Sequence, residues 1–244
     1  MSVLAIFAPR RFWRLLASDA MNISRDPMLM FAFVLSVLPG VGLFLGREAI
    51  DAASGTWGIA ELHRYFVPVV LVMPAILIGW VVGFLLIEDR DDGPLLAVEV
   101  TPVGKGGFMA YRLAVGAVLA AIITALALLL LLPQASPWLQ LVLLATVPID
   151  TALVALALLA LARNKVEGLA VTKLTNFAAI APLVAAVPSP FRVVAGVVPT
   201  YWIGELLHLG GDATFQPWIT AAGLVAAHGA AVVLLSAMTL RRKG

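Results

Sequence analysis

The sequence contains no cysteine and few charged residues. Without cysteine, the 244-residue chain can form no disulfide, thiolate metal site or cysteine redox centre. Charged residues make up 12% of the chain, whereas about 25% is usual in soluble domains, and hydrophobic residues make up 62%. The segments between the long apolar stretches are too short for a separate soluble catalytic domain of about 100 residues. The composition therefore predicts an integral membrane protein.

The sequence also lacks the usual signatures of nucleotide, metal and catalytic sites. One Gly-Lys pair resembles part of a phosphate-binding loop, but Glu99 and Gly106 stand where that loop needs Gly and Ser or Thr. His63, His208 and His228 lie in separate segments, so we expect no metal site. No Ser-His-Asp pattern is present, and a net charge of +2 gives no indication of a nucleic-acid partner. We therefore expect no enzyme activity and no cofactor in this chain.

Six apolar stretches of about 20 residues are each long enough to cross a hydrocarbon core about 30 Å thick. We therefore expect an all-α integral membrane protein with one transmembrane domain over residues 1–244. The predicted spans are 27–46, 66–87, 108–132, 138–162, 168–187 and 218–240.

Prolines and small residues inside these spans predict local features of the helices. Proline removes a backbone hydrogen bond and kinks or breaks a helix. The prolines within spans are Pro39, Pro74, Pro148 and Pro182. Small residues four positions apart allow two helices to approach closely. Such pairs are Gly42 with Gly46 and Gly79 with Gly83.

The distribution of Lys and Arg predicts the orientation of the spans. With six spans, 13 of the 16 basic residues fall on the side of the two termini, and Arg47, Arg64 and Arg192 fall on the other. The side rich in Lys and Arg is normally cytoplasmic. We therefore expect a multi-pass protein of the cell membrane with both termini in the cytoplasm.

Residues 10–25 predict an amphipathic helix before the first span. Polar residues, among them Arg14 and Asn22, recur at spacings of three and four, opposite an apolar stripe that includes Trp13 and Ile23. Such a helix lies along the membrane surface; the alternative is a soluble helix packed on a partner. Asp26 and Pro27 then have the pattern of an N-cap and a first helical residue, and predict the start of the next helix.

The segment between the fifth and sixth spans, 188–217, is apolar but too short and too rich in proline to cross the membrane. We expect a re-entrant or interfacial segment there, with Tyr201 and Trp202 at headgroup depth. It could cover a transport pathway or serve only as an aromatic anchor.

Asp150 and His228 are the ionisable residues predicted deepest in the spans. An isolated charge near the bilayer centre costs about 3 kcal/mol or more, so each residue needs a partner. One interpretation is a substrate path or proton relay. The other is a neutral, hydrogen-bonded pair of residues that fastens helices together.

An acidic run follows the second span and begins the loop 88–107. Its charged and turn-forming residues are Glu88, Asp89, Asp91, Asp92, Gly93 and Glu99. A second charged segment, with Lys165 and Glu167, precedes the fifth span. The simplest interpretation of the acidic run is a solvated loop.

These segments resemble parts of the ABC-type-2 exporter permeases. In that family the loop after the second span has an acidic pair, Gly-Thr-Leu and Thr-Pro. The matching residues are Glu88, Gly93, Leu95, Thr101 and Pro102, whereas Pro94 replaces the usual Thr. Residues 164–170 and 199–202 are similar to the small fluoroquinolone-export permeases in particular.

The resemblance implies that two six-span permeases pair and that each contacts a cytoplasmic ATP-binding subunit, which holds ATP and Mg. The loop 88–107 would act as a coupling helix, with Lys165 and Glu167 as a second contact. The first hypothesis is therefore an ATP-driven exporter of small amphipathic molecules, with drugs of the fluoroquinolone type as candidate substrates. The alternatives are a proton-coupled secondary carrier that uses Asp150 and His228, and a membrane scaffold without transport.

Overall fold

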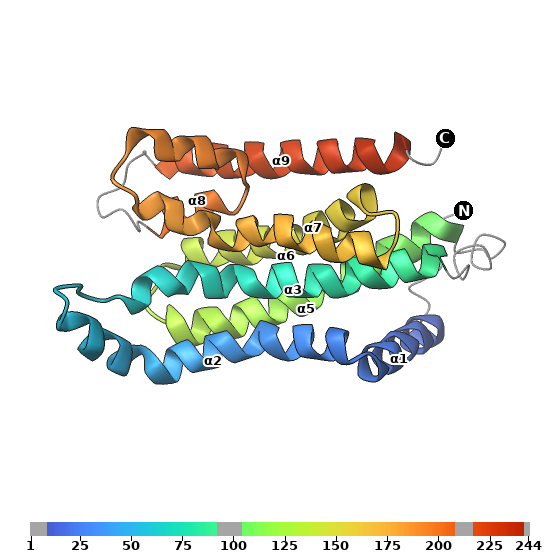
Figure 1. Ribbon diagram of the computed structural model, residues 1–244, viewed down its shortest axis with the longest axis horizontal. Helices are drawn as coiled ribbons and strands as arrows, with labels where there is room; N and C mark the ends of the chain where they lie inside the picture. The colour runs from blue at the N-terminus through green and yellow to red at the C-terminus, as the bar shows by residue number, and fades with distance from the viewer. Residues whose placement is uncertain (1–8, 92–103, 208–216, 242–244) are drawn as a thin grey trace.

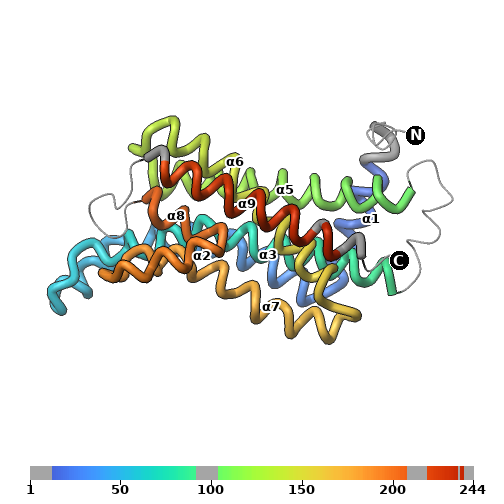
Figure 2. Tube along the Cα trace, turned by 90° about the horizontal axis from the view of Figure 1, so that it is seen from above, coloured from blue at the N-terminus to red at the C-terminus, as the bar shows by residue number. Residues whose placement is uncertain are grey.

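The protein is a bundle of long helices in the computed structural model, in which the longest helices run roughly along one direction (Figures 1 and 2). The structure describes residues 9–91, 104–207 and 217–241, and these contain helices but no β-strand. The elements are α1 (Pro9–Arg25), α2 (Pro27–Gly55), α3 (His63–Asp91), α5 (Gly104–Leu131), α6 (Pro137–Leu161), α7 (Lys165–Ile180), the 3₁₀ helices η2 (Ala181–Ala186) and η3 (Pro190–Val197), α8 (Tyr201–Leu206) and α9 (Pro217–Arg241). The all-α class expected from the sequence is confirmed.

Five helical segments are long and apolar enough to cross a membrane: α2, α3, α5, α6 and α7 together with η2. They correspond to the first five predicted spans. The described apolar part of α9, Ile219–Leu235, is shorter and corresponds to the sixth. These segments indicate a multi-pass membrane protein.

α2 and α3 extend further than the predicted spans. α2 continues to Gly55, and α3 begins at His63 and continues to Asp91. Glu88, Asp89 and Asp91, which we expected in a loop, therefore lie in the last turn of α3. α5 likewise begins at Gly104, within the predicted loop 88–107. The longer helices have a simple physical cause, because a helix continues past the apolar core until its backbone is capped or broken.

α3 is the central helix. It packs against α2, α5, α6 and α7, and 89% of its apolar window is buried within the protein. A helix that is apolar on all sides is suited to such a position. α2, α5, α6 and α7 therefore pack around α3 and expose their outer apolar faces, whereas α9 packs against α6.

Two glycines let α3 lie directly against α6. A Cβ atom added at Gly79 would lie 2.7 Å from Cβ of Val154, and one at Gly83 would lie 3.0 Å from Cβ of Leu158. The close contact predicted for this pair is confirmed. At Gly42 no heavy atom of the described chain lies within 4 Å of an added Cβ. The same prediction for Gly42 and Gly46 is wrong within this chain, because that part of α2 faces outward.

The prolines act differently along the chain. α2, α3 and α6 each continue as α-helix through Pro39, Pro74 and Pro148. The α-helical geometry of α7, in contrast, ends at Ile180, and Pro182 lies at the start of the 3₁₀ helix η2. Only the fifth predicted span is therefore broken at its proline.

The turn between α1 and α2 follows the sequence prediction. The Asp26 carboxylate accepts hydrogen bonds from the backbone N–H groups of Met28, at 2.9 Å, and Leu29, at 3.3 Å, and Pro27 is the first residue of α2. This cap satisfies donors that would otherwise be left free at the start of the helix. α1 also packs against α2, which fixes its position at one end of the bundle.

η2, η3 and α8 pack together at the opposite end of the bundle (Figure 1). The Tyr201 hydroxyl donates a hydrogen bond to Glu205, and Arg192 Nε lies 3.4 Å from the same carboxylate. Burial, followed by the contact with Glu205, raises the pKa of Tyr201, so its hydroxyl stays protonated and available as a donor. Trp202 Nε1 donates to the carbonyl of Gly196 at 2.9 Å.

These contacts bury the Tyr201 and Trp202 rings. Polar partners inside the protein hold both rings, so neither is an exposed anchor in this chain, and their place at headgroup depth stays a prediction. The most exposed apolar residues of this segment are Phe191, Val194 and Val197, which are 80%, 72% and 82% exposed. Their spacing of three residues places them on one face of the 3₁₀ helix η3.

We predict that Gly79→Ala lowers the melting temperature of the purified protein, whereas the matched Gly42→Ala does not. The added methyl group at residue 79 would collide with Val154 and with the backbone of Thr151, and such overpacking costs about 1–3 kcal/mol. Thermal unfolding in detergent measures the difference. Equal melting temperatures for the two variants would show that α3 and α6 are not in close contact.

Candidate functional site

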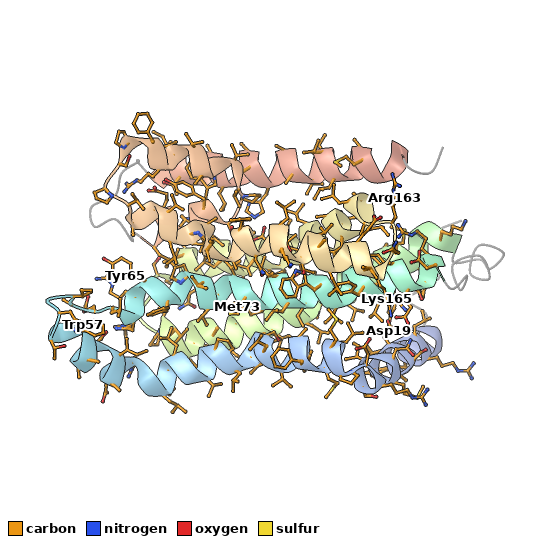
Figure 3. The ribbon with its side chains drawn as sticks, in the orientation of Figure 1. Asp19, Trp57, Tyr65, Met73, Arg163 and Lys165 are labelled. Carbon is orange, nitrogen blue, oxygen red and sulfur yellow. The ribbon has the colours of Figure 1, made fainter. Side chains whose placement is uncertain are left out.

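The candidate site residues gather mainly at one end of the bundle, here called the α1 end because α1 lies there. Asp19, Arg163 and Lys165 lie at this end, whereas Trp57 and Tyr65 lie at the other (Figure 3). α3 ends here, and the turn between α6 and α7 lies beside it. Two groups of charged residues, one buried and one partly exposed, occupy this end.

Arg112 of α5 forms the buried group with carboxylates from two other helices. Its Nη2 atom donates to Asp19 Oδ1 at 3.0 Å, and its Nη1 atom lies 2.7 Å from Asp89 Oδ2. The three side chains are only 4%, 12% and 11% exposed, and the guanidinium also lies over the Phe108 ring at 4.8 Å. Arg112 thus joins α1, α3 and α5.

Electrostatics makes these contacts interdependent. Burial raises the pKa of Asp19, and the positive charge of Arg112 opposes that rise. Breaking a buried ion pair by removing one partner typically costs about 3–5 kcal/mol, because the remaining charge stays uncompensated. The arrangement gives Asp89 a structural partner; its predicted part in coupling stays a prediction.

Sequence reasoning did not identify Asp19 or Arg112 as site residues. Arg112 was counted only among the basic residues of its side, although it lies inside a predicted span, where a charge signals a buried partner. Asp19 lies between the polar and apolar stripes of α1. The partners are 93 positions apart in the sequence, so no local pattern connects them.

The partly exposed group joins α3 to the turn between α6 and α7. Lys165 Nζ lies 3.0 Å from Glu88 Oε1, and these side chains are 46% and 38% exposed. Arg90 donates two hydrogen bonds to backbone carbonyls of that turn, to Ala162 at 3.2 Å and to Arg163 at 2.7 Å. The structure therefore brings together the two charged segments that the sequence indicated separately.

The remaining residues of this prediction have local roles or lie outside the described part of the chain. Glu167 accepts a hydrogen bond from the Arg163 backbone N–H at 2.8 Å, and its own N–H donates to the Asn164 side chain at 2.9 Å. This arrangement caps the start of α7. Asp91 pairs with Arg90 at 3.2 Å. The described residues do not include Asp92, Gly93 and Glu99.

Asp150 of α6 and His228 of α9 form a pair in the middle of the bundle. His228 Nε2 lies 3.3 Å from Asp150 Oδ1, and the two side chains are 6% and 4% exposed. The other ring nitrogen, Nδ1, lies 2.8 Å from the Leu224 carbonyl. Each of the two deep ionisable residues therefore has the other as its partner.

The two residues lie close enough to share a proton. A carbonyl oxygen can only accept, so Nδ1 carries a hydrogen and a neutral His228 would present a lone pair at Nε2. Contact with Asp150 then requires a proton on either the carboxyl or the imidazole. In the part of the chain that the structure describes, neither Asp150 Oδ2 nor His228 Nε2 has a hydrogen-bond partner, so the contact is an ion-pair distance and not a formed hydrogen bond. The pair could hold helices together or pass a proton.

No group of three or more His, Asp or Glu side chains suited to a metal ion is present in residues 9–91, 104–207 and 217–241. The arrangements at the α1 end are a buried group of ion pairs and a partly exposed one.

We predict that Asp150→Asn changes the melting temperature little, whereas Asp150→Ala lowers it. The amide of Asn can donate to His228 Nε2 in place of the shared proton, whereas Ala leaves a buried polar atom without a partner, which costs about 1–3 kcal/mol. Thermal unfolding of both variants in the same detergent tests this. Equal losses for Asn and Ala would contradict the pairing with His228.

The helices, their exposed apolar faces and the absence of strands from the described residues define the class: an all-helical, multi-pass membrane protein. Residues 19–236 match the family described as "Fluoroquinolones export permease protein Rv2686c-like". The chain belongs to this family of membrane permeases.

Two curated relatives have the same degree of similarity. They are Fluoroquinolones export permease protein MT2760 of Mycobacterium tuberculosis (strain CDC 1551 / Oshkosh) and Fluoroquinolones export permease protein Rv2686c of Mycobacterium tuberculosis (strain ATCC 25618 / H37Rv). Each is 27% identical over 237 residues, which cover 89% of this chain and 90% of the relative. No solved structure matches the chain.

Proposed function

We propose that this chain is the permease subunit of an ATP-driven exporter of small amphipathic molecules. The observation that carries the proposal is the junction of α3 with the turn between α6 and α7. Lys165, Glu88 and Arg90 join two segments that the resemblance to ABC-type-2 permeases implies as contacts for an ATPase. The partly exposed charges of Lys165 and Glu88 give a partner one continuous surface to bind.

The proposed topology has six spans, with α9 as the sixth. α9 is 25 residues long, or about 37 Å at 1.5 Å per residue, which exceeds a hydrocarbon core of about 30 Å. Six crossings place α1 and the end of α9 on one side, together with 13 of the 16 basic residues. The positive-inside rule makes that side cytoplasmic.

The energy source is assigned to a separate cytoplasmic ATP-binding subunit, which would hold ATP and Mg. The resemblance to ABC-type-2 permeases supports this assignment, as does the lack of a phosphate-binding loop in the sequence. The same resemblance supports pairing with a second permease copy or a related permease. The cytoplasmic surface for the ATPase would then lie at the α1 end.

The packing of α3 offers a route from that surface into the membrane. α3 contacts α2, α5, α6 and α7 along its length, so a displacement of its last turn would press on all four helices. Packed helices transmit such displacements because protein interiors are dense. ATP-driven movement of the partner subunit would thus change the packing of the whole bundle.

The proposed substrate class is based on the names of the relatives and on the mostly apolar interior of the bundle. Both relatives carry fluoroquinolone export in their names, and we extend this here to small amphipathic molecules, including drugs of that type. A mostly apolar bundle selects such molecules by shape and by a few polar groups.

The test is uptake of a fluorescent amphipathic drug into inside-out vesicles that contain this chain. The drug is offered with and without the candidate ATPase, and ATP or a pH gradient is supplied separately. We expect uptake only when both the ATPase and ATP are present. Uptake driven by a pH gradient without the ATPase would overturn the proposal.

That second result would support a proton-coupled carrier, the alternative function. The observation in its favour is the close approach of Asp150 and His228, with 3.3 Å between Oδ1 and Nε2 in the middle of the bundle. Buried ionisable residues within spans form proton relays in many transporters. In this case transport would depend on Asp150, and Asp150→Asn would abolish uptake.

We predict that Glu88→Lys prevents copurification of the ATPase, because it reverses a partly exposed charge of the proposed surface. The double variant Glu88→Lys with Lys165→Glu restores the ion pair within the chain but not the original charge positions. Glu48→Lys, an exposed reversal far from the α1 end, is the matched control. We expect the single and double variants to lose the ATPase and the control to retain it. If the double variant retains the ATPase and the single variant loses it, the ion pair only stabilises the fold.

A further inference from the structure

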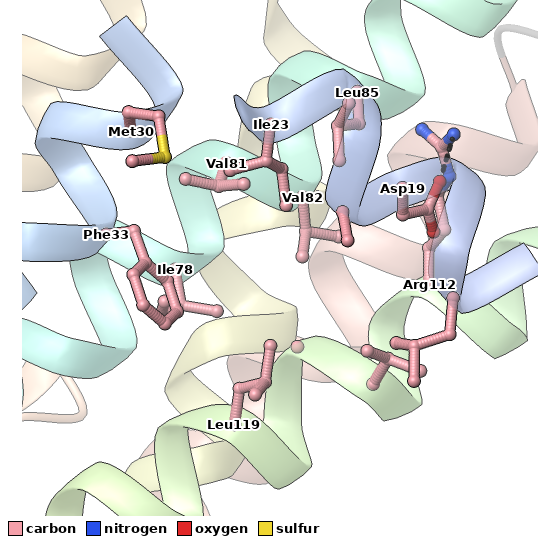
Figure 4. Close-up of a pocket in the computed structure, with 14 residues that line it drawn as sticks. Asp19, Ile23, Met30, Phe33, Ile78, Val81, Val82, Leu85, Arg112 and Leu119 are labelled. Atoms are coloured by element: carbon pink, nitrogen blue, oxygen red, sulfur yellow. Dashed lines mark hydrogen bonds and ion pairs between the residues drawn. The ribbon is translucent and has the colours of Figure 1, made fainter. Parts of the chain in front are cut away.

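A cavity of about 370 Å³ lies between α1, α2, α3 and α5 (Figure 4). Sites for small molecules commonly have volumes of about 300–1,000 Å³ and mainly apolar walls. The cavity fits this description, because apolar residues of all four helices form its wall, among them Ile23, Phe33, Val82 and Leu119. Among the described residues, Asp19 and Arg112 are the only ionisable ones in its lining.

The position of the cavity suits a molecule that arrives from the membrane. Its lining extends along α2 as far as Phe33, seven residues after the cap at Asp26, which corresponds to about 10 Å of helix. α1, which we expect to lie along the membrane surface, forms the wall at the other end. The cavity therefore covers the depth from the headgroups to the first part of the acyl chains, where amphipathic molecules accumulate.

The polar end of the cavity offers a carboxylate. The guanidinium of Arg112 is only 4% exposed and is directed at Asp19 and Asp89. The Asp19 side chain is 12% exposed, and a carboxylate can accept about four hydrogen bonds. A protonated amine is the head group that matches an acceptor at this place, with its apolar part in the remaining volume.

We propose that this cavity is a membrane-access site for small amphipathic amines, with the ammonium group at Asp19 and the apolar part between α2, α3 and α5. Its assignment as a substrate site rests on the proposed export function. Binding itself does not, since it requires neither ATP nor a partner subunit. The two ideas can therefore fail separately.

The test is photolabelling of the purified chain in phosphatidylcholine nanodiscs without an ATPase. The probe is an aryl-azide derivative of naphthylethylamine, and its uncharged N-acetyl analogue is the comparison. We expect saturable labelling of residues that line the cavity. At a limiting concentration of probe, labelling by the amine should be about tenfold stronger than labelling by the N-acetyl analogue, because the amine makes one additional charge-assisted hydrogen bond. Nonsaturable labelling, or equal labelling by both probes, would overturn the proposal.

Point variants test where the probe binds and distinguish binding in the cavity from binding to lipid. Ala20→Phe fills the cavity from an exposed position on α1, and Ala17→Phe adds the same side chain to the same helix outside the lining. We expect Ala20→Phe to abolish saturable labelling and Ala17→Phe to preserve it. Asp19→Asn should remove the preference for the amine. Unchanged labelling of Ala20→Phe would place the site elsewhere in the protein. Loss of labelling when phosphatidylethanolamine is added to the nanodiscs would show that a lipid occupies the site.

Discussion

The close contact between α3 and α6 is the constraint on which the other helix positions depend. Within a bilayer, lipid tails are as apolar as leucine, so helices associate through close packing rather than through escape from water. Gly79 and Gly83 provide that packing because they let the two helix backbones approach. With α3 fixed against α6, the last turn of α3 lies beside the turn that follows α6. The contacts of Arg90 and Lys165 across this junction depend on that alignment.

Charged residues at the α1 end fall into two physical classes. Arg112, Asp19 and Asp89 are buried and mutually compensated, so they fix the relative positions of three helices. Glu88 and Lys165 are partly exposed, and exposed ion pairs contribute only about 0–1 kcal/mol. The weak pair can exchange its partner for another chain at small cost, whereas the buried cluster cannot. The proposed surface for association and the buried ion pairs that fix the helices thus lie within the same few helical turns.

Much of the fold could be predicted because its determinants are local. Long apolar runs predict the helices, and the cap at Asp26 follows from side-chain chemistry within three residues. The pairing of Asp19 with Arg112 could not be predicted, since it depends on how α1 and α5 pack. The burial of Tyr201 was missed for a related reason. The preference of aromatic rings for membrane interfaces is an average, and here Glu205 provides a specific partner inside the protein. Sequence identified Asp150 and His228 individually as residues in need of partners, and only the structure pairs them.

The buried cluster and the cavity are mechanically connected. α2 packs against α3 and α5, whereas α9 packs against α6, α8 and η3, so the cavity and the Asp150–His228 pair belong to different parts of the bundle. Arg112 lies at the polar end of the cavity and holds α1 to α5. Separating α1 from α5 would widen the cavity, but it would also leave a buried charge without its partner, which costs free energy. The cavity can therefore widen easily only at its apolar end, where α2 and α5 are held by dispersion contacts, and this leaves the α3 and α6 contact intact.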